Sequence, residues 1–97
     1  MKTKEEILKI LKDEFPYLKE KYGVKKIGVF GSYSRAEQDI ESDVDILIQF
    51  EKPIGFFKFI AIEDYLSERL KAKVELVTED ALKPIMKPYV MEDVVYV

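Results

Sequence analysis

The 97-residue sequence contains no cysteine, no histidine and no tryptophan. Without histidine or cysteine, the chain cannot build a Ser-His-Asp or Cys-His nucleophilic site, a histidine or cysteine zinc site, or a disulfide framework. Any chemistry must therefore rest on carboxylates, hydroxyl groups, amines and backbone N–H groups.

The sequence also lacks a long apolar run and an excess of positive charge. Its densest apolar stretch, residues 56–62, contains Lys58 and is far shorter than the roughly 20 residues of a membrane-spanning helix. With 16 basic and 19 acidic residues the net charge is -3, which argues against direct nucleic-acid binding through a basic surface. The N-terminus is charged and has no apolar signal region, so we expect a cytoplasmic protein.

Residues 1–97 are expected to form one domain, because the chain has no repeat, no low-complexity segment and no long linker. Thr3 and Glu6 have the spacing of a capping box and precede apolar residues at helical spacing, which predicts a helix from Lys4. Pro16 should kink or restart this helix, and Gly23 should end it. A helical turn is expected over 34–37.

Short apolar runs predict strands at 25–30, 44–50 and 73–78, with an apolar helix over 56–70 between the second and third. Two strands joined through a helix should be parallel. The order predicts an α/β (α+β) fold, with a small mixed sheet and helices packed mainly on one face. Residues 83–97 contain Pro84 and Pro88 and stay unassigned, with either a last turn or an edge strand at 93–97.

Two carboxylates, Asp43 and Asp45, stand two residues apart at the start of a predicted strand, so both side chains should project from the same face. Carboxylates at close range repel each other, and a divalent cation would offset this repulsion. Mg²⁺ suits the pair because it prefers a few carboxylates together with substrate phosphates. The alternative is that Asp43 caps a turn and Asp45 is an exposed strand residue.

Gly31 and Ser32 follow the first predicted strand, where a turn with free N–H groups and a hydroxyl could hold phosphate. Arg35 lies about one helical turn later and could present a planar fork to phosphate oxygens. The alternatives are an ordinary turn at Gly31 and Ser32, and ion pairing of the arginine with Glu37, Asp39 or Glu41.

Glu75 is the only carboxylate inside the third predicted strand, and in a parallel pair it could point toward the two aspartates, although a lone residue of this kind is more often exposed to solvent. Three carboxylates balance two Mg²⁺ ions only when a polyphosphate is bound, as in two-metal nucleotidyl transfer. The constellation therefore indicates a nucleoside triphosphate site.

Minimal nucleotidyltransferases, a branch of the polymerase-β-like superfamily, carry the signature G-S-x-x-R-G followed by S-D-x-D and a hydrophobic residue. The sequence resembles this signature at residues 31–37 (GSYSRAE) and 42–47 (SDVDIL), and the resemblance covers nearly the whole chain. It implies a nucleotidyltransferase fold. It further implies that Gly31, Ser32, Arg35 and Ser42 bind the nucleotide and that Asp43, Asp45 and Glu75 form the catalytic, metal-binding set.

Two residues depart from the family pattern. Glu75 replaces the usual aspartate and is one methylene longer, which shifts its oxygen atoms by more than an ångström and is expected to weaken base catalysis. Ala36 replaces the usual glycine after the arginine, at a position where glycine permits a backbone that alanine resists.

The resemblance implies Mg²⁺-dependent transfer of a nucleoside monophosphate, AMP from ATP, onto a hydroxyl. Small members of the family resemble antitoxins that silence an all-helical HEPN toxin by adenylylating one of its tyrosines or by forming a complex with it. The competing hypothesis is a non-catalytic module that keeps the fold and blocks its partner sterically.

A partner surface is expected on the 56–70 helix, whose apolar residues exceed one stripe of about 100°. Most should pack in the core, but Phe56 or Phe59 is expected to lie outside it and to contact a HEPN-type partner or a second copy of the chain.

Overall fold

The first helix, α1 (Lys4–Tyr22), has the boundaries that the sequence predicts. In the computed structural model, which describes residues 2–97, the Thr3 hydroxyl accepts from the Glu6 N–H at 3.1 Å. The Glu6 carboxylate in turn accepts from the Thr3 N–H at 2.9 Å, which completes the capping box. Gly23 ends the helix in the left-handed region with φ 70°. Pro16 was expected to kink or restart the helix. The helix does not restart there, because α1 continues through Pro16 as one helix.

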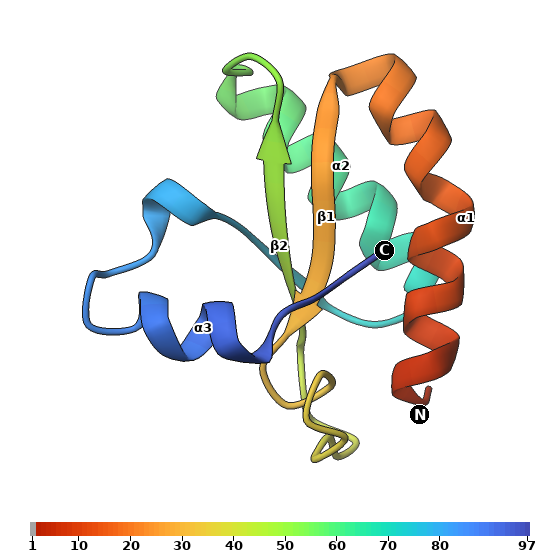
Figure 1. The fold of residues 1–97 in the computed structure, drawn as a ribbon. Helices are drawn as coiled ribbons and strands as arrows, with labels where there is room; N and C mark the ends of the chain where they lie inside the picture. Colours follow the sequence, from red (N-terminus) through yellow and green to blue (C-terminus); the bar gives the residue numbers. More distant parts are fainter. Residues whose placement is uncertain (1) are drawn as a thin grey trace.

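Seven further elements follow α1 along the chain (Figure 1). They are β1 (Val24–Phe30), β2 (Val44–Phe50), α2 (Phe56–Leu70), β3 (Val74–Thr78), the 3₁₀ turn η1 (Glu79–Ala81), α3 (Lys87–Asp93) and β4 (Val95–Tyr96). The predicted strand boundaries at 25 and 73 differ from the observed ones by one residue. The unassigned C-terminal region contains a short helix and, as one of the two expectations for 93–97, an edge strand.

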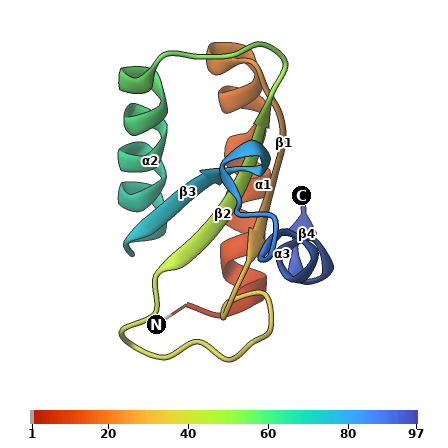
Figure 2. The same ribbon diagram turned by 90° about the vertical axis from the view of Figure 1, so that its left-hand side faces the viewer.

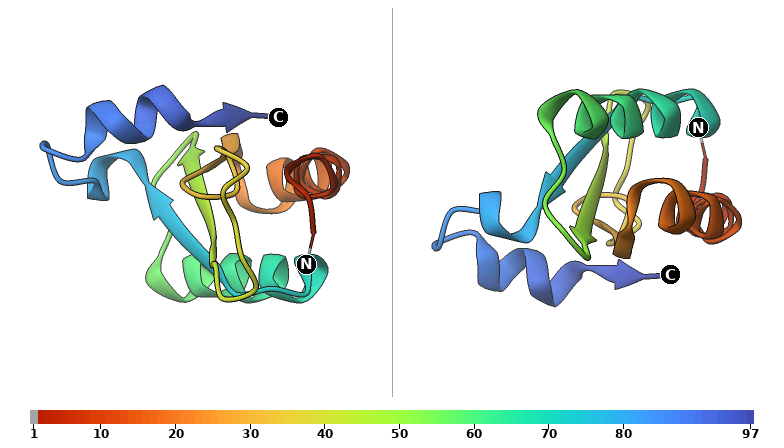
Figure 3. Two further views of the ribbon diagram at one scale, coloured as in Figure 1. Left: turned by 90° about the horizontal axis from the view of Figure 1, so that it is seen from below. Right: turned by 90° about the horizontal axis from the view of Figure 1, so that it is seen from above.

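The strands form one mixed sheet in the order β3-β2-β1-β4. β2 and β3 are parallel, which confirms the prediction from their helical connection, and β1 is antiparallel to both β2 and β4. Two helices, α1 and α2, cover one side of the sheet, whereas α3 lies on the other side (Figures 2 and 3). The fold is therefore α+β with its helices mainly on one face, as the sequence predicts.

The core lies between the sheet and the helices α1 and α2 and is built from aliphatic side chains. Its fully buried members include Ile7, Leu11, Leu18, Val24, Ile27, Val29, Ile46, Ile48, Ile62, Leu66 and Leu70. On α2 the buried residues follow helical spacing, so one stripe faces the sheet and the remaining apolar residues do not. None of the helices in residues 2–97 combines the length and apolar character needed to cross a membrane.

The outer edge of β3 is bonded to side chains of α2. The N–H of Val74 donates to the Ser67 hydroxyl at 3.1 Å, and the N–H of Leu76 donates to the Glu63 carboxylate at 2.8 Å. Both donors point away from β2, because alternate N–H groups of a strand face opposite sides. These two backbone groups at the edge of the sheet are therefore satisfied within the chain.

Candidate active site

Three carboxylates gather where β2 and β3 begin. Asp43 directly precedes β2, Asp45 is its second residue, and Glu75 is the second residue of β3. In the parallel ladder Asp45 is paired with Glu75, so their side chains project from the same face. The crossover through α2 thus places two acidic residues that are 30 positions apart in sequence side by side, as the parallel arrangement predicts.

The surroundings of Asp45 shift the pKa of its carboxyl group. Burial is the largest cause that raises its pKa to about 6, followed by the negative charges of Glu75 and Asp43, while the charge of Arg35 acts in the opposite direction. Glu75 itself is exposed to solvent, and Asp43 keeps 38% of its side-chain surface exposed. The like charges around Asp45 are the arrangement that a bound cation would stabilise.

Gly31 brings the loop that follows β1 into contact with this carboxylate. Its φ of 75° lies in the left-handed region, and a β-carbon at this position would collide with Oδ2 of Asp45. Glycine is required here for its backbone conformation and for its lack of a side chain. The close approach joins the predicted phosphate loop and the predicted metal ligands into one site.

The loop after Gly31 is a series of turns and contains no helix. The N–H groups of Arg35, Ala36 and Glu37 donate to the carbonyl groups of Gly31, Tyr33 and Ser32, respectively. The Arg35 bond has the spacing of an α-helical turn and the Ala36 bond has that of a 3₁₀ turn, so the expected turn at 34–37 begins earlier, at Gly31. Within residues 2–97, the backbone hydrogen bonds outside helices and strands include none donated by Ser32, Tyr33 or Ser34.

Ala36 has φ 57° and is one of two non-glycine residues with positive φ among residues 2–97. This is the position where the family pattern has glycine. An alanine β-carbon in the left-handed conformation costs about 1 kcal/mol or more. The loop therefore keeps the backbone that glycine would favour, although alanine is present.

Two of the predicted nucleotide-binding side chains are held by other protein groups. Arg35 contacts Glu37 through Nε at 3.3 Å, as the alternative interpretation allowed, and contacts Asp93 through Nη1 at 2.6 Å. The Ser42 hydroxyl accepts from the N–H of Asp39 at 2.9 Å and donates to its carboxylate at 3.3 Å. Ser42 thus closes the 39–42 turn and positions the chain for Asp43.

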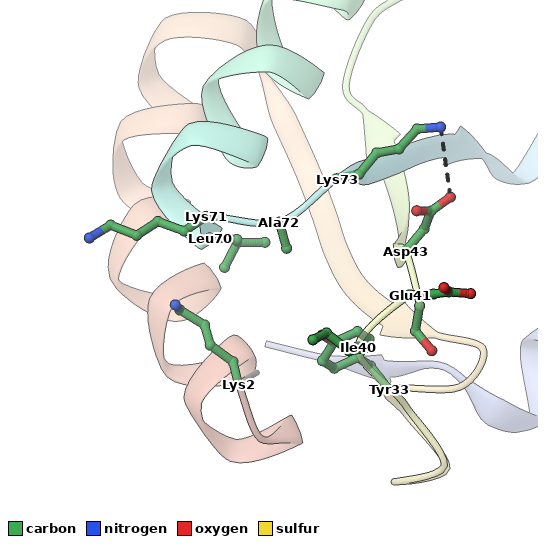
Figure 4. A pocket seen from close by; sticks show the side chains of 10 residues that line it. Lys2, Tyr33, Ile40, Glu41, Asp43, Leu70, Lys71, Ala72 and Lys73 are labelled. Atoms are coloured by element: carbon green, nitrogen blue, oxygen red, sulfur yellow. Dashed lines mark ion pairs between the residues drawn. The ribbon is translucent and has the colours of Figure 1, made fainter.

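A cavity of about 320 Å³ opens beside Asp43 (Figure 4). The Lys73 ammonium lies 4.0 Å from the Asp43 carboxylate, and the side chain of Lys73 is 80% exposed. Other lining residues are Lys2, Tyr33, Ile40, Glu41, Ser42, Leu70, Lys71 and Ala72. The sequence did not single out Lys73, which lies two residues before Glu75.

The carboxylates fit Mg²⁺ as a partial ligand set. Among residues 2–97, no group of three acidic side chains lies close enough to form a metal-binding cluster. Mg²⁺ is usually held by one or two carboxylates and completes its octahedral shell with water and substrate phosphates. Asp43 and Asp45 supply hard oxygen donors of this kind, with the loop at Gly31 beside them. The donor set therefore suits a cation that is bound together with a nucleotide.

A second hollow, of about 680 Å³, lies at the opposite ends of β2 and β3, and we call it the Phe56 groove. Its lining residues are Phe50, Pro53, Ile54, Phe56, Phe59, Leu76, Val77, Thr78, Asp80 and Ala81. Phe56 is 70% exposed and its neighbour Phe57 is 87% exposed, whereas Phe59 packs against the core. Of the two alternatives expected outside the core, Phe56 or Phe59, the exposed residue is Phe56.

The comparisons with known proteins agree with this geometry. The family model for a nucleotidyltransferase domain matches residues 4–97. A candidate protein adenylyltransferase of Methanocaldococcus jannaschii is 47% identical over 98 residues, with both chains fully covered. The protein adenylyltransferase MntA of Thermococcus cleftensis is 46% identical and covers all of this chain and 98% of its own.

Two solved structures share the fold. One is described as a candidate minimal nucleotidyltransferase, with TM-score 0.80 and 26% identity, covering 97% of this chain and 95% of its own. The other is the tri-AMPylated HEPN toxin of Shewanella oneidensis in complex with its MNT antitoxin, with TM-score 0.61, 22% identity and coverage of 96% and 66%. The second likeness concerns the fold alone.

Together the fold and the carboxylate–loop arrangement define a nucleotidyltransferase. The chain belongs to the nucleotidyltransferase domain family, as a minimal member whose full-length relatives include protein adenylyltransferases.

Proposed function

We propose that the chain transfers AMP from ATP to a hydroxyl group, with Asp43 and Asp45 as Mg²⁺ ligands and Glu75 as the general base. The observation that carries this proposal is the register of β2 and β3, which pairs Asp45 with Glu75 beside the Gly31 loop. The name of the Thermococcus cleftensis relative, a protein adenylyltransferase, supports ATP as the nucleotide and a protein as the acceptor.

The phosphate groups of ATP would bind at the loop that follows β1. Ser32 can donate through its hydroxyl and its N–H group, and Arg35 can offset the negative charge of the leaving pyrophosphate. Mg²⁺, when bound, would draw the phosphates toward Asp43 and Asp45 and stabilise the charge that develops on them. Asp45 then has to be ionised, although its pKa is raised to about 6.

The chemical step needs a base beside the α-phosphate. Glu75 is exposed and adjacent to Asp45, so its carboxylate can take the proton of an acceptor hydroxyl that approaches from solvent. The acceptor oxygen forms a bond to the α-phosphorus as the α–β phosphoanhydride bond breaks. AMP remains on the acceptor, and pyrophosphate leaves.

The acceptor is proposed to be a tyrosine of an all-helical HEPN-type partner. The chain encloses little space for an acceptor of its own, and the shared fold includes an MNT antitoxin in complex with an AMPylated HEPN toxin. The Phe56 groove offers exposed aromatic anchors, which dominate many protein interfaces, and is the proposed docking surface.

A non-catalytic antitoxin is the second candidate. It is favoured by the presence of Glu75 where the family pattern has aspartate, and by the lack of a closed three-carboxylate cluster in residues 2–97. Such a module would bind its partner at the same surface and neutralise it sterically, without transfer of AMP.

Substitutions at Glu75 separate the two candidates. With a HEPN-type partner, Mg²⁺ and ATP labelled at the α-phosphate, Glu75→Gln should lower labelling of the partner by about tenfold or more. Glu75→Asp should retain or improve transfer, and partner binding should be unchanged in both variants. Glu20→Gln, an exposed carboxylate on α1, is the matched control. Partner binding by the wild type without any labelling would identify the module.

A further inference from the structure

The end of α3 is bonded to the phosphate loop. Asp93, the last residue of α3, accepts from Arg35 Nη1 through Oδ2 at 2.6 Å, and its backbone carbonyl accepts from the Ser34 hydroxyl. Asp93 and Arg35 are 58 positions apart in sequence. In Figure 1 the end of α3 lies beside the point where β1 passes into the loop.

These contacts limit the freedom of the arginine side chain. A free arginine side chain loses much rotamer entropy when it is ordered, more than most other side chains. Here Glu37 contacts Nε and Asp93 contacts Nη1, and the ion pairs among residues 2–97 do not use Nη2. Arg35 thus keeps donors for an anion while its direction is set by Asp93. The Arg35 N–H bonds to the Gly31 carbonyl and Gly31 contacts Asp45, so the arginine belongs to the loop beside the predicted metal ligands.

The backbone on either side of Asp93 is attached to the rest of the fold. The residues that follow it form β4, which pairs with β1 at Gly28 and Val29, and Val90 of α3 is buried. Because the backbone is anchored on both sides of Asp93, this carboxylate stays within reach of the guanidinium when a phosphate approaches. It is therefore suited to hold the guanidinium in place and unsuited to act as a removable competitor of phosphate.

We propose that Asp93 is a positioning residue that directs the Arg35 guanidinium toward the outer phosphates of the bound nucleoside triphosphate. This role rests on the proposed function, because it requires the triphosphate to bind at the loop after β1. It gives α3 and β4 a part in nucleotide binding, although neither element carries a residue of the family signature.

A double-mutant cycle tests the role through the affinity for Mg²⁺-ATP, measured by calorimetry. Arg35→Gln should weaken binding by about tenfold or more, because a charge-assisted hydrogen bond to phosphate is lost. Asp93→Asn should weaken it by roughly fivefold, and Asp93→Glu should restore part of the loss. In the Arg35→Gln background, Asp93→Asn should have no further effect, because its action passes through the arginine. Glu92→Gln, on the same helix, is the control and should bind normally.

A comparison of AMP with ATP tests whether Asp93 acts on the outer phosphates. Binding of AMP, which lacks the outer phosphates, should be equal in the wild type and in Asp93→Asn. Tighter binding of ATP by Asp93→Asn would show that Asp93 competes with phosphate, and this would overturn the proposal. So would additive losses in the cycle, or a lower melting temperature with unchanged affinity for ATP.

Failure of the proposed function has a different signature. A wild type that does not bind Mg²⁺-ATP would overturn both the function and the role of Asp93. A wild type that binds Mg²⁺-ATP and follows the predicted cycle without transferring AMP would contradict only the catalytic step.

Discussion

The two ends of the parallel β2–β3 pair differ in chemistry. At one end, Asp43, Asp45 and Glu75 bring like charges together, and burial followed by these charges raises the pKa of Asp45. At the other end, Phe56 and the groove that it lines leave aromatic surface in water. Both features oppose the stability of the isolated chain, since repulsion and exposed apolar area are each unfavourable. Each end is complementary to something that the chain does not supply: a cation with a nucleotide at one, an apolar partner at the other.

The largest expected effect comes from removing charge at the carboxylate end. The double variant Asp43→Asn with Asp45→Asn should lower AMP transfer by about 100-fold or more, because metal stabilisation of the transition state is worth several kcal/mol. It should also abolish the rise in melting temperature that Mg²⁺-ATP gives the wild type. Equal thermal shifts in the two proteins would contradict the assignment of the metal ligands.

The second largest effect is expected at the apolar end, from a substitution of Phe56. Phe56→Ser should leave the melting temperature almost unchanged, because the side chain is 70% exposed. It should weaken binding of a HEPN-type partner by roughly thirtyfold, equivalent to about 2 kcal/mol at an interface anchor. Phe59→Ser is the matched comparison and should lower stability, because Phe59 packs against the core. Unchanged partner affinity in Phe56→Ser would remove the groove from the interface.

A smaller effect is the dependence of the free energy of unfolding on pH, through the carboxylate end. The pKa of Asp45 is raised from an ordinary value of about 4 to about 6, so the folded state binds more protons than the unfolded state within this range. The contribution of Asp45 to the free energy of unfolding should therefore fall as pH rises from 4 to 6. Without nucleotide, Asp45→Asn should match the wild type near pH 4 and exceed it at pH 8 by on the order of 1 kcal/mol, allowing for partial solvent screening.

Urea unfolding of both proteins at several pH values measures this difference. Asp64→Asn, an exposed carboxylate on α2, serves as the control and should show the wild-type pH profile. If Asp45→Asn unfolds more easily at pH 8, then Asp45 has a structural role that outweighs the repulsion.

The smallest effect concerns Ala36, in the loop that joins β1 to β2. Ala36→Gly should stabilise the protein by up to about 1 kcal/mol, because glycine adopts φ 57° without the strain of a β-carbon. Ala61→Gly, at an exposed position inside α2, should instead destabilise it by about 1 kcal/mol. Thermal unfolding of the two variants compares the same chemical change in opposite backbone contexts, and a loss of stability in both would contradict the strain at Ala36.

Features that depend on neighbouring residues were predictable from the sequence. The Thr3–Glu6 capping box and the stop at Gly23 involve groups within a few residues, and α1 has the predicted ends. The parallel pairing of β2 and β3 also followed from the helix between them, and with it the position of Glu75 beside Asp45. Both are consequences of periodicity and chain length, which a single sequence displays.

Contacts between distant segments that no local pattern or connection links were not predictable. The partner of Arg35 is Asp93, whose position is set by the pairing of β4 with β1 and not by any local pattern. The Ser42 hydroxyl bonds to Asp39 in the same turn, a local contact that was not predicted, and its assignment to the nucleotide stays a prediction. Lys73 was missed because its relation to Asp43 exists only once β2 and β3 are adjacent.

The hydrogen bonds that β3 donates to Ser67 and Glu63 have a consequence for association between chains. An open strand at the edge of a sheet can accept a strand from another molecule and so initiate aggregation. Here the outward N–H groups of Val74 and Leu76 are already bonded to α2, so that edge is a poor template for β-augmentation. Any partner on this side must therefore be recognised by side-chain contacts, and the same two bonds help to keep copies of the chain from joining edge to edge.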